Sequence, residues 1–169
     1  MRKIVPLCAA IALAASFSLV NPVRAAEPTE FVRTANQINL EEIELGHFAA
    51  EHGESHDVRE FGAKLADDHQ EAEGKLHEVA HHHDMHLRDH LDQEHQAKVD
   101  ELEHHHGHEF DHAFLHAMMD GHRDAIGIFE AASHHAEHKD VRDYAVEILP
   151  HLHHHLDRAT EIAGHMHEH

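Results

Sequence analysis

The chain has 169 residues, of which 28 are histidine, 33 are acidic and 13 are basic, so its formal net charge is −20 when the histidines are neutral. This balance argues against nucleic acid as a partner, because binding a phosphate backbone requires clustered lysine and arginine. The single cysteine, Cys8, lies close to the N-terminus, so a thiolate metal site and a cysteine nucleophile are excluded from the remainder of the chain.

Residues 1–25 have the features of a secretory signal peptide. Two basic residues precede an apolar run over residues 4–20, and residues 23–25 provide a small-residue cleavage site. We therefore expect an exported, periplasmic protein in which residues 26–169 form a single domain. The apolar run is long for a signal peptide, so an uncleaved anchor is the alternative. After cleavage, no other segment is apolar enough to span a membrane.

Apolar residues recur at intervals of three and four along the chain, and no segment shows the alternation of a strand. This pattern predicts four long amphipathic helices, over residues 30–52, 56–83, 108–133 and 140–164. A short helix is expected within residues 84–107. Gly53 should end the first long helix, while Ser55 and Asp140 should cap the second and the last. The sequence thus predicts an all-α fold, an antiparallel ferritin-like four-helix bundle with a short extra helix between the second and third long helices.

Each predicted long helix carries one polar residue where its apolar stripe requires a core residue. These four residues are Glu42, His69, His122 and His155. In an up-down-up-down bundle they would lie about 15 to 23 Å from one end, at about 1.5 Å per residue, and would therefore share one layer. Three imidazoles and a carboxylate can bind Zn²⁺, Cu²⁺, Ni²⁺ or Fe²⁺, and coordination would compensate the cost of burying the carboxylate. A hydrogen-bond network without metal would satisfy the same groups and is the alternative.

The remaining histidines are concentrated in short runs. The runs within residues 77–86, 104–112 and 165–169 are expected to meet at the end of the bundle opposite the turn at residues 53–55. Such a surface would bind several divalent ions weakly and exchangeably. The surface candidates are His81, His82, His83, His104, His105, His106, His108 and His165. The alternative is that these side chains are solvated and only buffer pH.

A dinuclear oxidase centre of the ferritin type needs a glutamate from each of two helices and Glu-x-x-His from each of the other two. Five such spacings occur, at Glu44/His47, Glu78/His81, Glu101/His104, Glu103/His106 and Glu109/His112. About as many are expected by chance in a chain so rich in glutamate and histidine, and none places both residues on the predicted inner face. We therefore disfavour oxidase chemistry.

Three short motifs give the chain a resemblance to a known family. They are Asp68-His69, Gly121-His122 before an arginine, and Leu149-Pro150 followed by His155. With these motifs the chain resembles the bacterial domain-of-unknown-function 4142 family over about residues 31–162. The resemblance implies an exported protein with a ferritin-like helical bundle, and it implies no particular activity. The extreme histidine content departs from the family pattern, so the metal hypothesis rests on the residues of this chain.

The sequence as a whole favours a periplasmic, non-enzymatic protein that buffers, sequesters or delivers a divalent transition metal such as zinc, nickel or copper. The core residues would form the tight site, and the histidine-rich surface would form a reservoir of lower affinity. Because imidazoles titrate near pH 6.5, a pH-switched acid-stress or envelope-interaction protein is the alternative. A ferritin-like metal-dependent oxidase is the third hypothesis. Which metal is bound, and whether the protein is a homo-oligomer, stay open.

Overall fold

The computed structural model describes residues 28–166, and within that range the chain forms five α-helices and no strand. The helices are α1 (Pro28–His52), α2 (His56–His82), α3 (Gln93–Glu103), α4 (Gly107–His135) and α5 (Lys139–Met166). The predicted all-α class and short extra helix are confirmed, and each long helix ends within two residues of its predicted bounds. The signal-peptide prediction lies outside the described residues. None of the described helices has the length and apolar character that crossing a membrane requires.

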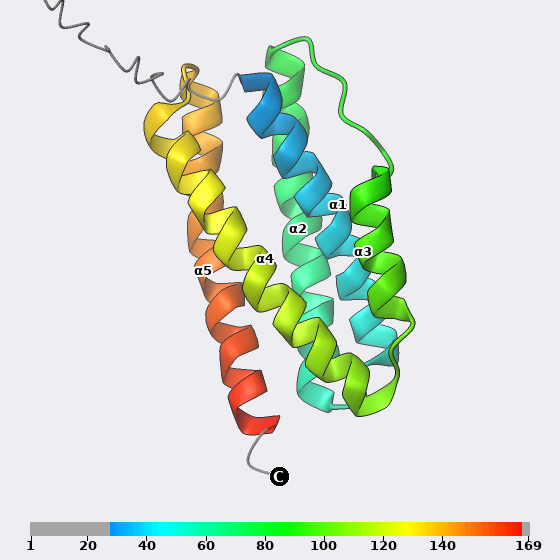
Figure 1. Ribbon diagram of the computed structural model, residues 1–169. Helices are drawn as coiled ribbons and strands as arrows, with labels where there is room; N and C mark the ends of the chain where they lie inside the picture. Colours follow the sequence, from blue (N-terminus) through cyan, green and yellow to red (C-terminus); the bar gives the residue numbers. More distant parts are fainter. Residues whose placement is uncertain (1–27, 167–169) are drawn as a thin grey trace, which may run out of the picture.

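The four long helices form two antiparallel pairs, as Figure 1 shows. A tight turn at residues 53–55 joins α1 to α2, and Ser55 caps α2 as predicted by accepting a hydrogen bond from the Val58 N–H group. Residues 136–138 join α4 to α5, and α2 packs against α5 between the pairs. The short helix α3 runs back beside α1, toward the end where the α1–α2 turn lies (Figure 1).

The predicted up-down-up-down order of the helices is wrong, because α3 reverses the chain before α4 begins. The carboxylate of Asp111, near the start of α4, accepts hydrogen bonds from the backbone N–H groups of Glu54 (2.9 Å) and Ser55 (2.8 Å) in the α1–α2 turn. The segments 77–86 and 104–112 therefore lie at opposite ends of the bundle. The single histidine-rich end predicted from the sequence does not form.

The backbones of α1 and α2 approach closely at two glycines. A Cβ atom added to Gly46 would lie 2.7 Å from the carbonyl oxygen of Gly62, and a Cβ atom added to Gly62 would lie 2.7 Å from the carbonyl oxygen of Gly46. Only residues without a side chain fit at this crossing. The close contact fixes how α1 and α2 are placed relative to each other, one helical turn from Glu42 in α1 and two turns from His69 in α2.

The apolar core consists of two clusters separated by a polar layer. One cluster contains Phe31, Leu76, Phe129 and Tyr144, and the other contains Leu45, Phe61, Phe114 and Ile162. In each long helix, the polar residue predicted from the sequence lies between the segments that supply these two clusters. All four are buried, so the layer of Glu42, His69, His122 and His155 crosses the interior of the bundle. The layer forms despite the altered helix order, because His122 and His155 lie near the middle of their helices.

Candidate metal centre

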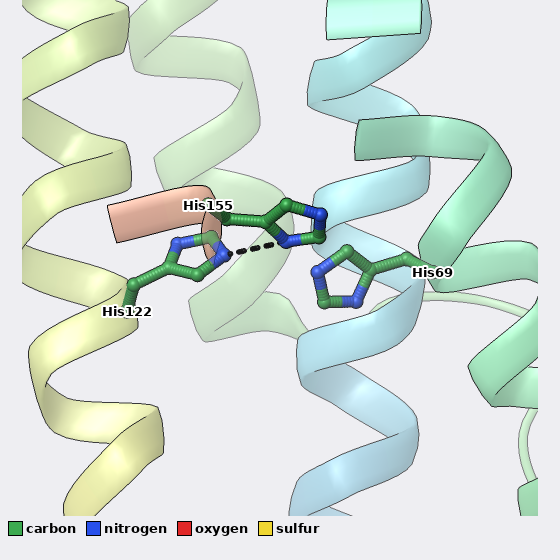
Figure 2. Close-up of side chains that lie close together, drawn as sticks. All are labelled: His69, His122 and His155. Atoms are coloured by element: carbon green, nitrogen blue, oxygen red, sulfur yellow. Dashed lines mark hydrogen bonds between the residues drawn. The ribbon is translucent and has the colours of Figure 1, made fainter. Parts of the chain in front are cut away.

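Three of the four predicted core residues converge in the interior. Figure 2 shows the rings of His69 from α2, His122 from α4 and His155 from α5 gathered at one point. Each residue is at most 2 % exposed, and the ring centroids lie 5.3 to 5.9 Å apart. One ring nitrogen from each histidine lies within 4.8 Å of one from each of the others. Nitrogens bound to one tetrahedral zinc ion lie about 3.3 Å apart, so a small inward movement would bring all three within reach of a single ion.

The ring of His69 is oriented by Asn39 of α1. The Asn39 amide nitrogen donates hydrogen bonds to the Glu73 carboxylate (2.9 Å) and to the Tyr144 hydroxyl (3.3 Å), so its amide oxygen is the atom that faces His69. His69 Nδ1 lies 3.1 Å from this oxygen and donates to it. The unprotonated nitrogen of a neutral His69 is then Nε2, which is buried and has no hydrogen-bond partner among the described residues.

The ring of His122 is oriented by its own helix. Its Nδ1 lies 2.9 Å from the backbone carbonyl oxygen of Met118, one turn earlier in α4. A carbonyl oxygen only accepts hydrogen bonds, so Nδ1 carries the proton. In a neutral His122 the lone pair is therefore on Nε2, on the side of the ring that faces His155.

The ring of His155 is oriented by Asp68 of α2. His155 Nε2 lies 3.0 Å from Asp68 Oδ2, and the same carboxylate also accepts from the ammonium group of Lys64. Partial burial alone would raise the pKa of Asp68, but the hydrogen bonds from Lys64 and His155 outweigh it and lower that pKa. Asp68 is thus an ionised acceptor, His155 Nε2 is the donor, and the lone pair of a neutral His155 is on Nδ1.

As a result, two unprotonated nitrogens face each other inside the protein. His122 Nε2 and His155 Nδ1 lie 3.2 Å apart, as the dashed line in Figure 2 marks. With the other nitrogen of each ring donating elsewhere, neither of this pair has a proton to share while both rings are neutral. The contact needs either an additional proton or a cation between the two nitrogens.

Burial disfavours the additional proton. It lowers the pKa of His122 to about 3, with repulsion from His155 as a further cause. The pKa of His69 lies well below its usual value because of burial and the neighbouring imidazoles, and burial lowers the pKa of His155 despite its hydrogen bond to Asp68. Near neutral pH the layer therefore presents three neutral bases whose lone pairs have no proton to accept.

Glu42, the fourth predicted ligand, lies on a different side of His122. Its Oε1 is 3.9 Å from His122 Nδ1, and it does not belong to the group of converging ring nitrogens. Its Oε2 is buried without a hydrogen-bond partner among the described residues. Burial, with a contribution from the charge of Glu41, raises its pKa well above the usual value. The structure thus brings three of the four predicted ligands together and places the carboxyl group beside them.

A small cavity adjoins the layer between α2 and α5. Its volume is about 10 Å³, and its walls include both His69 and His155. The exposed His151 and the partly exposed Lys75 also line it, so it connects the buried rings with the surface. A cavity of this size has room for about one water molecule or ion.

The surface candidates are dispersed over both ends of the bundle. The end of α2 carries His81, His82 and His83. The connection between α3 and α4 is surrounded by His104, His105, His106 and His108, and His165 lies in the last turn of α5. His82 Nδ1 and His83 Nε2 lie 3.4 and 3.1 Å from Asp140, and His105 Nδ1 lies 3.3 Å from Glu109. In all five Glu-x-x-His spacings the histidine is exposed, at positions 47, 81, 104, 106 and 112.

Several residues that support the site were missed in the sequence. In the sequence analysis Asp68 enters only as part of the Asp68-His69 motif, and Asn39 does not enter at all. Asn36 and Asn39 both donate to Glu73, which lies four residues after His69 on the same face of α2. The sequence did contain a signal for this support: Asn36 and Asn39 are two amide side chains three residues apart within an apolar stripe, and Glu73 lies on the helix that faces them. Asp120, which lies two residues before His122, is exposed and pairs with Arg123 on the surface.

The family model described as "Domain of unknown function (DUF4142)" matches residues 18–162. The chain belongs to the DUF4142 family. This confirms the resemblance identified from the sequence motifs. The matched segment contains all four residues of the polar layer, but the family is one of unknown function and assigns no role to them.

A solved structure supports the fold of this DUF4142 chain. The crystal structure of a DUF305 fragment from Deinococcus radiodurans aligns with a TM-score of 0.71, covering 82 % of this chain and 95 % of the fragment at 15 % sequence identity. At that identity the likeness is one of fold alone. No curated protein matches the DUF4142 chain in sequence.

Proposed function

We propose that this protein binds one divalent transition-metal ion in its interior through His69, His122 and His155, and that it buffers, sequesters or delivers that metal. The observation that carries the proposal is the pair of lone pairs facing each other across 3.2 Å, His122 Nε2 and His155 Nδ1. The unpartnered, buried Nε2 of His69 adds a third base at the same place. A cation satisfies all three at once, whereas a single shared proton satisfies only two.

The partners of each ring support a metal site rather than an internal hydrogen-bond network. Metal-binding histidines usually donate their other ring N–H group to a carboxylate or a carbonyl oxygen, which fixes the tautomer and makes the ring a better ligand. Asp68, the carbonyl oxygen of Met118 and the amide oxygen of Asn39 are acceptors of this kind. The layer is therefore arranged as a preformed set of ligands.

Neutral imidazoles suit zinc, nickel and copper, and the lack of cysteine in the described residues removes thiolate ligands. Three histidines leave a fourth position for water or for a transferred ligand. Glu42 would occupy that position only if its side chain turned toward the other face of His122. The small cavity beside His69 and His155 would provide the path by which the ion enters.

The signal-like sequence of residues 1–25 supports a periplasmic location for this activity, where a metal buffer would not depend on thiols. The exposed histidines would add weak sites that exchange rapidly with the solution. We also take the bundle to be ferritin-like, because two antiparallel helix pairs joined by one long connection are the connectivity of that class. The glutamates of the ferritin dinuclear pattern are not on the inner face, which disfavours the oxidase hypothesis.

Equilibrium dialysis followed by elemental analysis tests the proposal. The protein is dialysed at pH 7.5 against Zn²⁺, Ni²⁺ or Cu²⁺ in turn, as wild type and as His69→Leu/His122→Leu, in which leucine fills the core positions. A control, His153→Gln/His154→Gln, removes two exposed imidazoles beside His155. We expect the core variant to lose one tightly bound equivalent and the control to retain it. Equal tight binding by wild type and core variant would refute the proposal.

The pH-switch function is favoured by a different observation, the exposed histidines that lie beside carboxylates, such as His82 with Asp140 and His90 with Asp89. Imidazole side chains gain a positive charge in acid, so acidification would cancel much of the negative charge of the protein. Unlike metal binding, this function predicts that acid changes the association state of the protein even when a strong chelator is present.

A further inference from the structure

The end of the bundle opposite the α1–α2 turn holds a second group of metal-ligating side chains. His83 directly follows α2, His138 lies in the connection between α4 and α5, and Asp140 is in the first turn of α5. One ligand atom from each residue lies within 4.8 Å of one from each of the others. Segments 57 residues apart in the sequence thus meet in a cluster of two imidazoles and a carboxylate.

The distances around Asp140 are those of a coordination site. His83 Nε2 lies 3.2 Å from Oδ1 and 3.1 Å from Oδ2 of Asp140. His82 Nδ1 lies 3.4 Å from the same Oδ2 atom, and the rings of His83 and His138 are in contact, with their centroids 4.4 Å apart. Ligand atoms on a tetrahedral zinc ion lie about 3.3 Å apart. The cluster therefore needs little movement to exchange its shared protons for a metal ion.

The cluster is partly enclosed but open to solvent. The side chains of His83 and Asp140 are 17 % and 33 % exposed, while that of His82 is 66 % exposed. A groove of about 640 Å³ lies beside them, and both His83 and His138 line it. An ion can therefore reach the ligands directly from solution, unlike an ion bound in the buried layer.

The two helix pairs are joined by different interactions at the two ends of the bundle. At the α1–α2 turn, the fully buried Asp111 accepts hydrogen bonds from two backbone N–H groups, which cannot be replaced by a metal. At the opposite end, the carboxylate of Asp140 is held by imidazoles, and also accepts from the backbone N–H group of Val141. Imidazole and carboxylate are both ligands for divalent zinc.

We propose that the cluster of His83, His138 and Asp140 binds one divalent ion, with His82 as fourth ligand. The ion ties the end of α2 to the start of α5. We call this cluster the clasp site. It shares no residue with the buried layer, and it joins the two helix pairs at the end of the bundle opposite the Asp111 contact. The sequence assigned His82 and His83 only to a diffuse reservoir; the structure gives them defined partners from another part of the chain.

Zinc binding by the full chain tests this inference separately from the core site. In the His69→Leu/His122→Leu background, zinc equivalents are counted by isothermal titration with and without the added pair His83→Ala/His138→Ala. The control adds His134→Ala/His135→Ala instead, which removes two exposed histidines from the same end of the bundle. Amide hydrogen exchange at residues 83–85 and 140–142 is measured with and without zinc.

We expect the clasp variant to lose one equivalent that the control retains. Zinc should slow amide exchange in both segments of the control and leave both unchanged in the clasp variant. Equal stoichiometry in the two variants would overturn the inference, as would zinc-dependent protection that persists in the clasp variant. If the wild type showed no tight site in the core but still bound zinc at the clasp site, only the proposed function would be refuted. Failure of this inference and failure of the proposed function can therefore be told apart.

Discussion

The buried and the exposed histidines of this protein are the same side chain in two different chemical conditions. In the interior, each ring has one nitrogen committed to an acceptor from the protein, and the other nitrogen faces its neighbours without a proton. Nearer the surface, several rings lie beside a carboxylate, as His90 does with Asp89 and His105 with Glu109. Burial and fixed partners, rather than the number of histidines, are what make an imidazole cluster a defined site.

The cluster at Asp140 lies between these extremes. His83 and Asp140 are partly buried, whereas His138 is exposed. Among the described residues, no hydrogen bond fixes the second ring nitrogen of His83. We expect the metal affinity of the cluster to lie below that of the buried layer and above that of isolated surface histidines. The comparison therefore predicts three classes of site that differ in metal affinity, and the following substitutions and conditions test this difference.

The largest expected effect is a loss of stability of the metal-free protein in acid. The buried imidazoles stay neutral when folded, whereas in the unfolded chain they take up protons near pH 6.5, so stability falls as the pH decreases below that value. Each ring contributes about 1.4 kcal/mol per pH unit. Glu42 has the opposite sign, because its raised pKa makes the folded state bind a proton that the unfolded chain releases.

Urea unfolding at pH 7.5, 6.0 and 5.0 in the presence of chelator measures this effect. The useful quantity is the difference in slope between wild type and His69→Leu/His122→Leu, because the surface histidines contribute equally to both. We expect the slope of the wild type to be steeper by about 1.4 to 2.8 kcal/mol per pH unit. Parallel slopes would mean that these rings take up protons in the folded state as readily as in the unfolded chain.

The next effect is the loss of the amide that orients His69. Asn39→Ala removes the acceptor for His69 Nδ1 and one donor to Glu73, both of which are buried. Leaving buried polar groups unsatisfied costs about 1 to 3 kcal/mol, so the free energy of unfolding in urea should fall by that amount. Thr34→Ala, a change at a partly exposed position on the same helix, is the control. An effect no larger than that of the control would count against the role given to Asn39.

An effect of similar size, on metal affinity, is expected from the acceptor that orients His155. Asp68→Ala removes the carboxylate that His155 Nε2 donates to, and changes of this kind typically weaken metal binding about 10- to 100-fold. Asp67→Ala removes a neighbouring, exposed carboxylate and is the matched control. Competition with a chromophoric chelator gives both affinities. If the two variants bind zinc equally well, Asp68 does not act on the site.

The smallest effect should follow changes among the dispersed histidines. His104→Ala/His108→Ala alters two exposed side chains near the α3–α4 connection, and surface substitutions usually change stability by less than about 0.5 kcal/mol. The tightly bound equivalent measured by dialysis should remain, and only weak binding should decrease. Loss of the tight equivalent would show that the interior and the surface are not separate.

Helical periodicity was sufficient to identify the polar layer. It assigns each residue to a face of its helix, so Glu42, His69, His122 and His155 could be recognised as core positions from spacing alone. It was not sufficient for the order of the helices, because that depends on α3 packing against α1 and on Asp111 contacting the α1–α2 turn. Nor does spacing fix side-chain rotamers, which is why it could not tell that Glu42 lies on the Nδ1 side of His122.

The proposed metal site depends on three unprotonated ring nitrogens that converge in the interior of the metal-free protein. Long-range ¹H–¹⁵N NMR of the histidine rings at pH 7.5 reports which nitrogen of each carries the proton. We expect unprotonated Nε2 in His69 and His122 and unprotonated Nδ1 in His155, with all three signals shifting together when one equivalent of zinc is added. A proton on the nitrogens between His122 and His155, with no change on addition of zinc, would contradict it.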